Sequence, residues 1–143
     1  MARQKRRDKK FFTPAEANAT LPLVRAIVQD IAELARDLRD RYERLAKALP
    51  KRGCVSEAHG EELEQIKGEF ERRQEKMQEY LKELGSLGVE LNDFMTGLID
   101  FPSRMDGHEV CLCWRLGEPE VAHWHEIDAG FAGRHKLEVN VGG

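Results

Sequence analysis

The sequence predicts an α+β fold, in which a long antiparallel helical hairpin, preceded by a short helix, packs on a small antiparallel β-sheet. Two observations predict it. Between residues 21 and 85, apolar side chains recur every three or four positions, as they do on one face of a helix. From residue 89 to residue 128, the pattern changes to short extended stretches separated by turns that contain glycine, which is typical of antiparallel strands.

Length and composition limit the architectures that the chain can form. A chain of 143 residues is long enough for one domain with a real core. Charged residues make up 34% and hydrophobic residues 41%, a balance that favours long solvated helices over a compact sandwich. Residues 1–10 carry six basic side chains, so we expect a flexible basic tail followed by a single domain over residues 11–143.

The same numbers indicate a cytoplasmic protein. No apolar run reaches transmembrane length, so we expect no membrane span, and no apolar segment follows the basic N-terminus as it would in a secretory signal. The three cysteines are odd in number and lack the spacing of a disulfide framework, which suits a reducing compartment.

The short helix is predicted from its capping residues. Thr13 is a good N-cap, Pro14 fits the first helical position, and Glu16 completes a capping box with Thr13. Pro22 disfavours helical geometry in the residue before it, so this helix is predicted to end or kink near Thr20–Leu21.

The hairpin is predicted over residues 21–85. Pro50 ends its first helix and begins the connection, residues 50–54. One hairpin cannot fully cover two such stripes with so small a sheet, so a homo-oligomer formed through the stripes is expected. The apolar positions are Val24, Ile27, Ile31, Leu34, Leu38, Tyr42, Leu45 and Leu49 on the first helix, and Leu63, Ile66, Phe70, Met77, Leu81 and Leu84 on the second.

The sheet region, residues 89–128, is predicted to hold short strands at 89–91 and 97–102, a turn at 104–107, and two stronger strands at 109–115 and 120–127. The last segment, 129–143, is expected to be a loop and tail. It alternates weakly at Leu137, Val139 and Val141, so it adds an edge strand or trails.

Register decides which side chains of the two stronger strands meet. A two-residue loop at 117–118 would place Trp114 and Trp124 on opposite faces. A loop of three or five residues pairs Leu112 with Trp124 and gathers both tryptophans toward the helices, where burial stabilises them. We favour this register, because Pro119 also fits a loop better than a ladder.

The favoured register leaves two Cys and two His on the other face, a composition that suggests zinc or another divalent metal. Alternate residues on a strand lie ~7 Å apart, so four regular ladder positions do not converge easily on one ion. A Cys–His pair with one carboxylate, from Asp100, Glu126 or Asp128, remains possible, as does a half-buried sheet face without metal. The candidate metal ligands are Cys113, His123, His125 and Asp128.

Two further chemistries are open in this stretch. Cys113 beside His123 has the residue types of a nucleophile and its base, although a strand cysteine is more often a small buried hydrophobe. Arg134 follows a loop that contains glycines and could bind an anion, or it could pair with Asp128 across that loop.

Three stretches resemble a bacterial family known only as domain of unknown function 2203: FTPAEANATLPLVR, GVELNDFMTGLIDFP and VCLCWRLGEPEVAHWHEIDAGFAGR. The resemblance covers nearly the whole chain beyond the basic tail. It implies that an aromatic residue is usual at the positions of Cys111 and His123, and it implies no activity, substrate or catalytic residue. It therefore moves attention to Cys113, Glu118, His125, Glu126 and Asp128.

Three functions are consistent with the sequence. The first is a small binding or assembly module for a protein or small-molecule partner, with candidate ligand-binding residues Cys113, Glu118, His125, Glu126, Asp128 and Arg134. The second is a metal-dependent or thiol enzyme centred on residues 109–134. The third is an RNA- or ribosome-associated factor that binds nucleic acid through Arg3, Lys5, Arg6, Arg7, Lys9 and Lys10.

Overall fold

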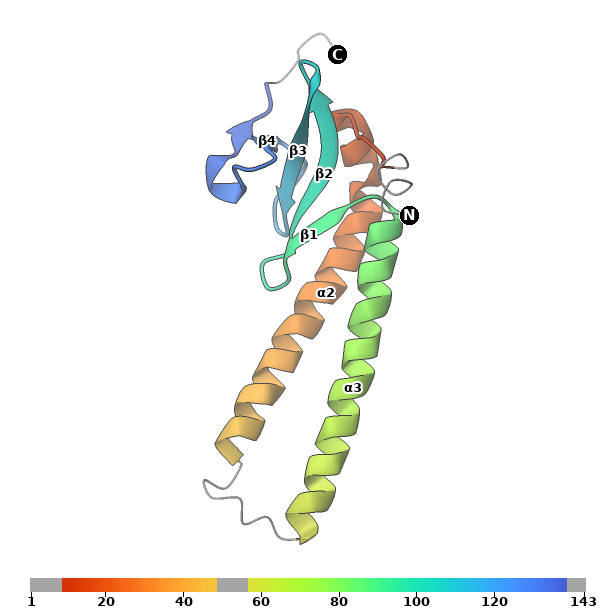
Figure 1. The fold of residues 1–143 in the computed structure, drawn as a ribbon, viewed down its shortest axis with the longest axis vertical. Coiled ribbons are helices and arrows are strands. Elements are labelled where there is room, and N and C mark those ends of the chain that lie inside the picture. The colour runs from red at the N-terminus through yellow and green to blue at the C-terminus, as the bar shows by residue number, and fades with distance from the viewer. Residues whose placement is uncertain (1–8, 49–56, 139–143) are drawn as a thin grey trace.

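The computed structural model describes residues 9–48 and 57–138. Within these residues the chain forms two long helices and then a five-stranded antiparallel sheet, so the predicted α+β class is confirmed (Figure 1). The elements are α2 (Pro14–Ala48), α3 (Glu57–Ser86), β1 (Glu90–Asp93), β2 (Leu98–Met105), β3 (His108–Arg115), β4 (His123–Glu126), a short 3₁₀ helix η1 (Phe131–Gly133) and β5 (His135–Lys136).

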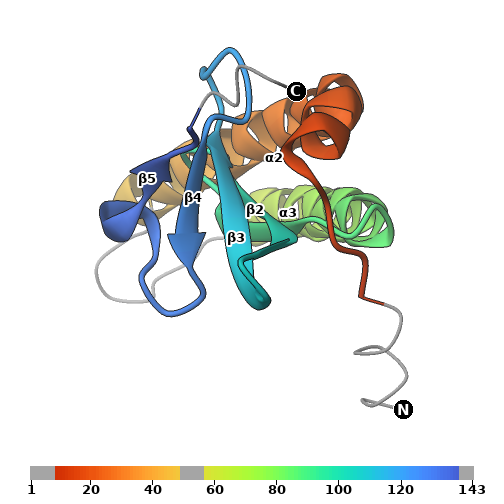
Figure 2. The same ribbon diagram turned by 90° about the horizontal axis from the view of Figure 1, so that it is seen from above.

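The helices form one layer and the sheet forms the other, as the view along the long axis shows (Figure 2). The strands follow one another across the sheet in chain order, β1 to β5, each antiparallel to the next. The sheet lies beside the first half of α2, and the hairpin continues well beyond it (Figure 1). No helix in the described part of the chain is both long and apolar enough to cross a membrane.

The predicted start of the first helix is confirmed. The backbone N–H of Glu16 donates to Thr13 Oγ1 at 3.1 Å, and the N–H of Thr13 donates to Glu16 Oε1 at 2.9 Å, which is a complete capping box.

The predicted end of a short helix near Pro22 is wrong, because α2 runs through this residue as one helix of 35 residues. An interior proline costs ~3 kcal/mol or more through a lost hydrogen bond and a steric clash. Leu21 and Val24, on either side of it, are buried at 3% and 0% exposure, and each buried aliphatic side chain contributes ~1.5–3 kcal/mol. Packing on both sides of Pro22 therefore outweighs its local cost, and no separate short helix forms.

The favoured register of the two central strands is confirmed. Leu112 lies opposite Trp124, and Cys113 lies opposite His123. The connection is longer than predicted, since β4 begins only at His123 and residues 116–122 lie between the strands. The extra loop residues keep Pro119 out of the ladder without changing the pairing.

The neighbouring strands extend further than predicted. β2 and β3 pair over eight residues each and are joined by Asp106 and Gly107, both with positive φ, as in a type I′ hairpin turn. The optional edge strand forms as β5, which pairs with β4. Val139 and Val141 lie outside the described residues.

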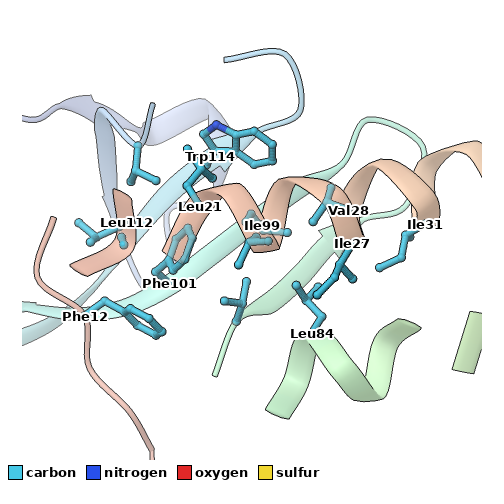
Figure 3. Packing of buried hydrophobic residues seen from close by; sticks show 14 of the residues in the cluster. Phe12, Leu21, Ile27, Val28, Ile31, Leu84, Ile99, Phe101, Leu112 and Trp114 are labelled. Atoms are coloured by element: carbon cyan, nitrogen blue, oxygen red, sulfur yellow. The ribbon is translucent and has the colours of Figure 1, made fainter. Parts of the chain in front are cut away.

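The core lies between α2 and the inner face of β2 and β3 (Figure 3). Trp114 is fully buried there, as predicted, and Phe12 packs edge-on against Phe101 with ring centroids 5.1 Å apart. Trp124 shares this face but is only half-buried, so the prediction that both tryptophans are buried is wrong for Trp124. Because β4 is close to the sheet edge, the indole of Trp124 lies against His135 of β5 instead. Their ring centroids are 4.8 Å apart.

We call residues 36–47 of α2 and 60–76 of α3 the distal hairpin. Its helices are linked by an ion network in which Arg41 and Arg73 both bind Asp37, at 3.0 and 2.9 Å, and Arg41 also binds Glu69 at 3.1 Å. Tyr42 is 66% exposed, so the predicted apolar stripe is incompletely covered here. Leu49, the connection 50–54 and Cys54 lie outside the described residues.

Candidate functional site

Three polar side chains are buried together on the sheet face that points away from the helices. Asp100 of β2, Cys113 of β3 and His125 of β4 are 4%, 0% and 3% exposed. One ligand atom from each lies within 4.8 Å of the others. Asp100 is the direct strand partner of Cys113, and His125 sits one diagonal step away, a separation that long side chains can span.

Hydrogen bonds hold this cluster in place. The Nε2 atom of His125 lies 2.9 Å from Asp100 Oδ1, and its Nδ1 lies 2.6 Å from the backbone oxygen of Glu126. The side-chain amide of Asn92 donates to the other oxygen of Asp100. Both ring nitrogens of His125 therefore face oxygen atoms, and the two contacts fix the orientation of the ring.

Cys113 is not poised as a nucleophile. Burial and the nearby Asp100 carboxylate raise the pKa of its thiol to about 11, although the Arg134 guanidinium opposes this. A reactive cysteine needs a lowered pKa and access to substrate. Cys113 lies opposite His123, but its burial argues against this pair as nucleophile and base. Burial and Asp100 likewise raise the pKa of Cys111, to about 12.

A second polar pair lies beside the cluster. Arg134 binds Glu118 through both terminal nitrogens, and the backbone N–H of Arg115 donates to the same carboxylate at 2.8 Å. The expected pairing of Arg134 with Asp128 is therefore wrong. Arg134 instead binds Glu118, in the two-bond geometry that a guanidinium forms with a carboxylate. Burial alone would raise the pKa of Glu118, but the bonds from Arg134 and Arg115 hold it below its usual value.

The predicted site residues are only partly brought together. Cys113, His125, Glu118 and Arg134 gather on the outer face of the sheet. The others do not: Glu126 is hydrogen-bonded to His108 at 3.0 Å, Asp128 is exposed, and His123 is outside the cluster, its Nδ1 buried with no hydrogen-bond partner in the described structure.

The predicted metal set therefore needs correction. Cys113 and His125 belong to a group of potential metal ligands, but the third member is Asp100 rather than His123 or Asp128. Asp128 follows β4 in an exposed turn, where it cannot reach the buried face. The sequence contains a signal for Asp100, because it is the only charged residue in the apolar stretch LIDFP. Once the strands are paired, its side chain lies on the same outer face of the sheet as that of Cys113.

The basic tail is mostly outside the described residues, which begin at Lys9. Lys9 binds Glu109 at 3.1 Å, and the Lys10 ammonium lies 4.7 Å from the Phe12 ring centroid. These two side chains are thus engaged within the fold. Arg3, Lys5, Arg6 and Arg7 lie outside the described part, so binding of nucleic acid through them stays a prediction.

Comparisons with known proteins place the chain in one family. Searches of curated proteins and of solved structures return no match. The family described as "Uncharacterized conserved protein (DUF2203)" matches residues 10–137, which include both helices, all five strands described above and the buried cluster. This chain therefore belongs to the DUF2203 family of uncharacterized conserved proteins.

Proposed function

We propose that this protein is a small binding and assembly module that pairs with a second copy of itself through the distal hairpin. The observation that carries the proposal is the incomplete cover of its apolar stripe. Leu45, Ile66 and Phe70 are only half-buried. Together with four charged side chains they line a surface hollow of about 300 Å³ between the helices. Tyr42, three residues before Leu45 on α2, is exposed as well, and incompletely covered apolar side chains of this kind mark interaction sites.

The charges of the distal hairpin favour a second copy as the occupant. Its α2 part carries five basic and three acidic side chains, whereas its α3 part carries six acidic and four basic ones. In a twofold dimer, α2 of each copy can lie on α3 of the other, so opposite net charges meet twice. The four helices would then enclose the two apolar stripes, as in a helical bundle.

The buried cluster supports a binding module better than an enzyme. Asp100, Cys113 and His125 are the residues with the most reactive chemistry, yet each is less than 5% exposed. An enzyme must bring its reacting groups against substrate. We place the module in the cytoplasm, because Cys111 and Cys113 are free thiols, as expected in a reducing compartment.

Sedimentation equilibrium over a range of concentrations tests the proposal. We expect the wild-type chain to have twice the monomer mass, and Tyr42→Glu to be monomeric at the same concentration. Leu23→Glu is the matched control, because Leu23 is also an exposed apolar residue of α2, at 51%, but lies outside the distal hairpin. It should remain dimeric.

Each other outcome overturns the proposal. If the wild-type chain stays monomeric at the highest attainable concentration, the apolar stripe does not bind a second copy and must bind a different partner. Equal dissociation of Tyr42→Glu and Leu23→Glu would move the interface away from the distal hairpin. Because both positions are exposed in the monomer, both variants are expected to fold, and circular dichroism checks this.

A further inference from the structure

We infer that the Asp100 carboxylate, the Cys113 thiolate and His125 Nε2 form a buried binding site for a divalent transition metal ion of the zinc type. Three different strands supply the three ligands, so the ion would tie β2, β3 and β4 together. The inference is independent of the self-association proposed above, because the distal hairpin takes no part in it.

The donor set and its spacing fit such an ion. Carboxylate oxygen, thiolate sulfur and imidazole nitrogen are the ligands that zinc takes in proteins, with bonds of ~2.0–2.3 Å. Tetrahedral bonds of that length put neighbouring ligand atoms roughly 3–4 Å apart. The three ligand atoms already lie within 4.8 Å of one another, so side-chain adjustments of about an ångström would close the site.

The surrounding hydrogen bonds are those that orient metal ligands. A ligating histidine usually donates its second N–H to a backbone carbonyl or a carboxylate, which fixes the ring. His125 Nδ1 faces the Glu126 backbone oxygen at 2.6 Å, which leaves Nε2 directed at Asp100. Asn92 holds the far oxygen of that carboxylate, so Oδ1 faces the site. Two of the three ligands are thus already positioned by partners outside the cluster.

Charge balance also favours a dication. A buried carboxylate and a buried thiolate together carry two negative charges, which a divalent ion neutralises where water cannot. Binding releases to solvent the Cys113 thiol proton and the hydrogen-bond proton between Asp100 Oδ1 and His125 Nε2, and the ion takes their place. All three ligands are buried in the folded sheet, so the binding free energy of the ion adds to the stability of the fold.

Cobalt(II) is the probe for the test, since its thiolate complexes absorb in the near ultraviolet. The purified full chain is stripped with a chelator, titrated with cobalt(II) or zinc(II), and measured for bound metal, absorption and melting temperature. We expect one ion per chain, a thiolate-to-cobalt absorption band, and a melting temperature that rises with zinc.

Each ligand has a matched control of the same or similar type on the same sheet face. The controls are Cys111 for Cys113, His123 for His125 and Glu90 for Asp100. Cys111 is the strand partner of His125, His123 that of Cys113 and Glu90 that of Asp100, and all three lie outside the cluster. Cys113→Ala, His125→Gln and Asp100→Asn should lose more affinity than the roughly 10- to 100-fold typical of losing an outer hydrogen-bond partner. Cys111→Ala, His123→Gln and Glu90→Gln should bind like the wild-type chain.

One variant keeps the test decisive if a ligand variant fails to fold. In the double variant Cys54→Ala/Cys111→Ala, Cys113 is the only cysteine left, so the cobalt–thiolate band must persist. Its loss would overturn the inference. So would a folded wild-type chain that binds no stoichiometric metal, or a His123→Gln variant as impaired as His125→Gln.

Discussion

Arg134 donates two parallel hydrogen bonds to Glu118, at 3.1 Å to Oε1 and 2.6 Å to Oε2. Their side chains are only 16% and 18% exposed. The pair fastens the segment after η1 to the loop between β3 and β4. It therefore holds in place the chain that borders the buried face carrying Cys113.

The Glu118–Arg134 pair should make stability depend on pH in the acid range. Glu118→Gln should cost ~1.5–3 kcal/mol at neutral pH, as hydrogen bonds to charged groups do. The pKa of Glu118 is lowered in the folded state, so its contribution is present above the unfolded value, near 4.5, and is lost as pH falls through the folded value. Urea unfolding from pH 7 to pH 3 should show the variant and wild type converging.

Glu109→Gln is the control for that measurement. Glu109 pairs with Lys9, but the two side chains are 38% and 34% exposed, so its loss should cost less than ~1 kcal/mol. Parallel pH profiles for wild type and Glu118→Gln would contradict the assigned role of the pair.

The fold was predictable where a pattern had a single physical solution. Of the two registers considered, only one put Trp114 and Trp124 on the same face of the sheet, and the structure has that register. Thr13 and Glu16 likewise have a well-defined local geometry, and the capping box forms as expected. In both cases a local rule and the global packing point to the same answer.

The sequence was less informative where contacts between residues distant in the chain determine the structure. Asp100 joins the cluster through pairing between β2 and β3, which periodicity alone does not reveal. The choice of Glu118 over Asp128 by Arg134 depends on how the segment after β4 folds back. A helix end at Pro22 does not form, because the local preference of proline does not include the burial of α2 residues on both sides of it.

Pro22 gives a second prediction, since it lies inside α2 and is exposed. Pro22→Ala restores a backbone N–H that can donate to the carbonyl of Asn18, and it removes the ring clash. We expect a gain of ~1–3 kcal/mol in the free energy of unfolding, measured by urea denaturation. Pro14→Ala is the control and should change little, because the first helical position needs no N–H donor. A destabilised Pro22→Ala would mean that the proline ring itself packs.

The stripe of α2 gives a third prediction. Ile31 is fully buried in the core, whereas Leu38 is only half-buried in the distal hairpin. Ile31→Ala should cost ~2–5 kcal/mol, and Leu38→Ala clearly less, though more than the ~0.5 kcal/mol of an ordinary surface change. Both are measured below the concentration at which the chain associates. Equal costs would show that the distal hairpin is as well packed as the core.

Gly97 gives the fourth prediction, because it closes the contact between the sheet and α2. Its φ is +67°, and a Cβ there would lie 2.8 Å from Val28 Cγ1 and 2.8 Å from Leu116 Cβ. Its carbonyl also accepts the backbone N–H of Leu116 at 3.0 Å, so the backbone cannot move away freely. Gly97→Ala therefore combines ~1–2 kcal/mol of left-handed strain with ~1–3 kcal/mol of overpacking.

Gly107→Ala separates those two costs. Gly107 also has a positive φ, +83°, but a Cβ at this position would have no neighbouring atom within 4 Å, so only the backbone strain applies. Thermal or urea unfolding should thus rank Gly97→Ala below Gly107→Ala, and both below wild type. If the two variants lost equal stability, the side chains of Val28 and Leu116 would be able to move away from the added methyl group. The close approach of Gly97 to α2 would then not be a rigid feature of the fold.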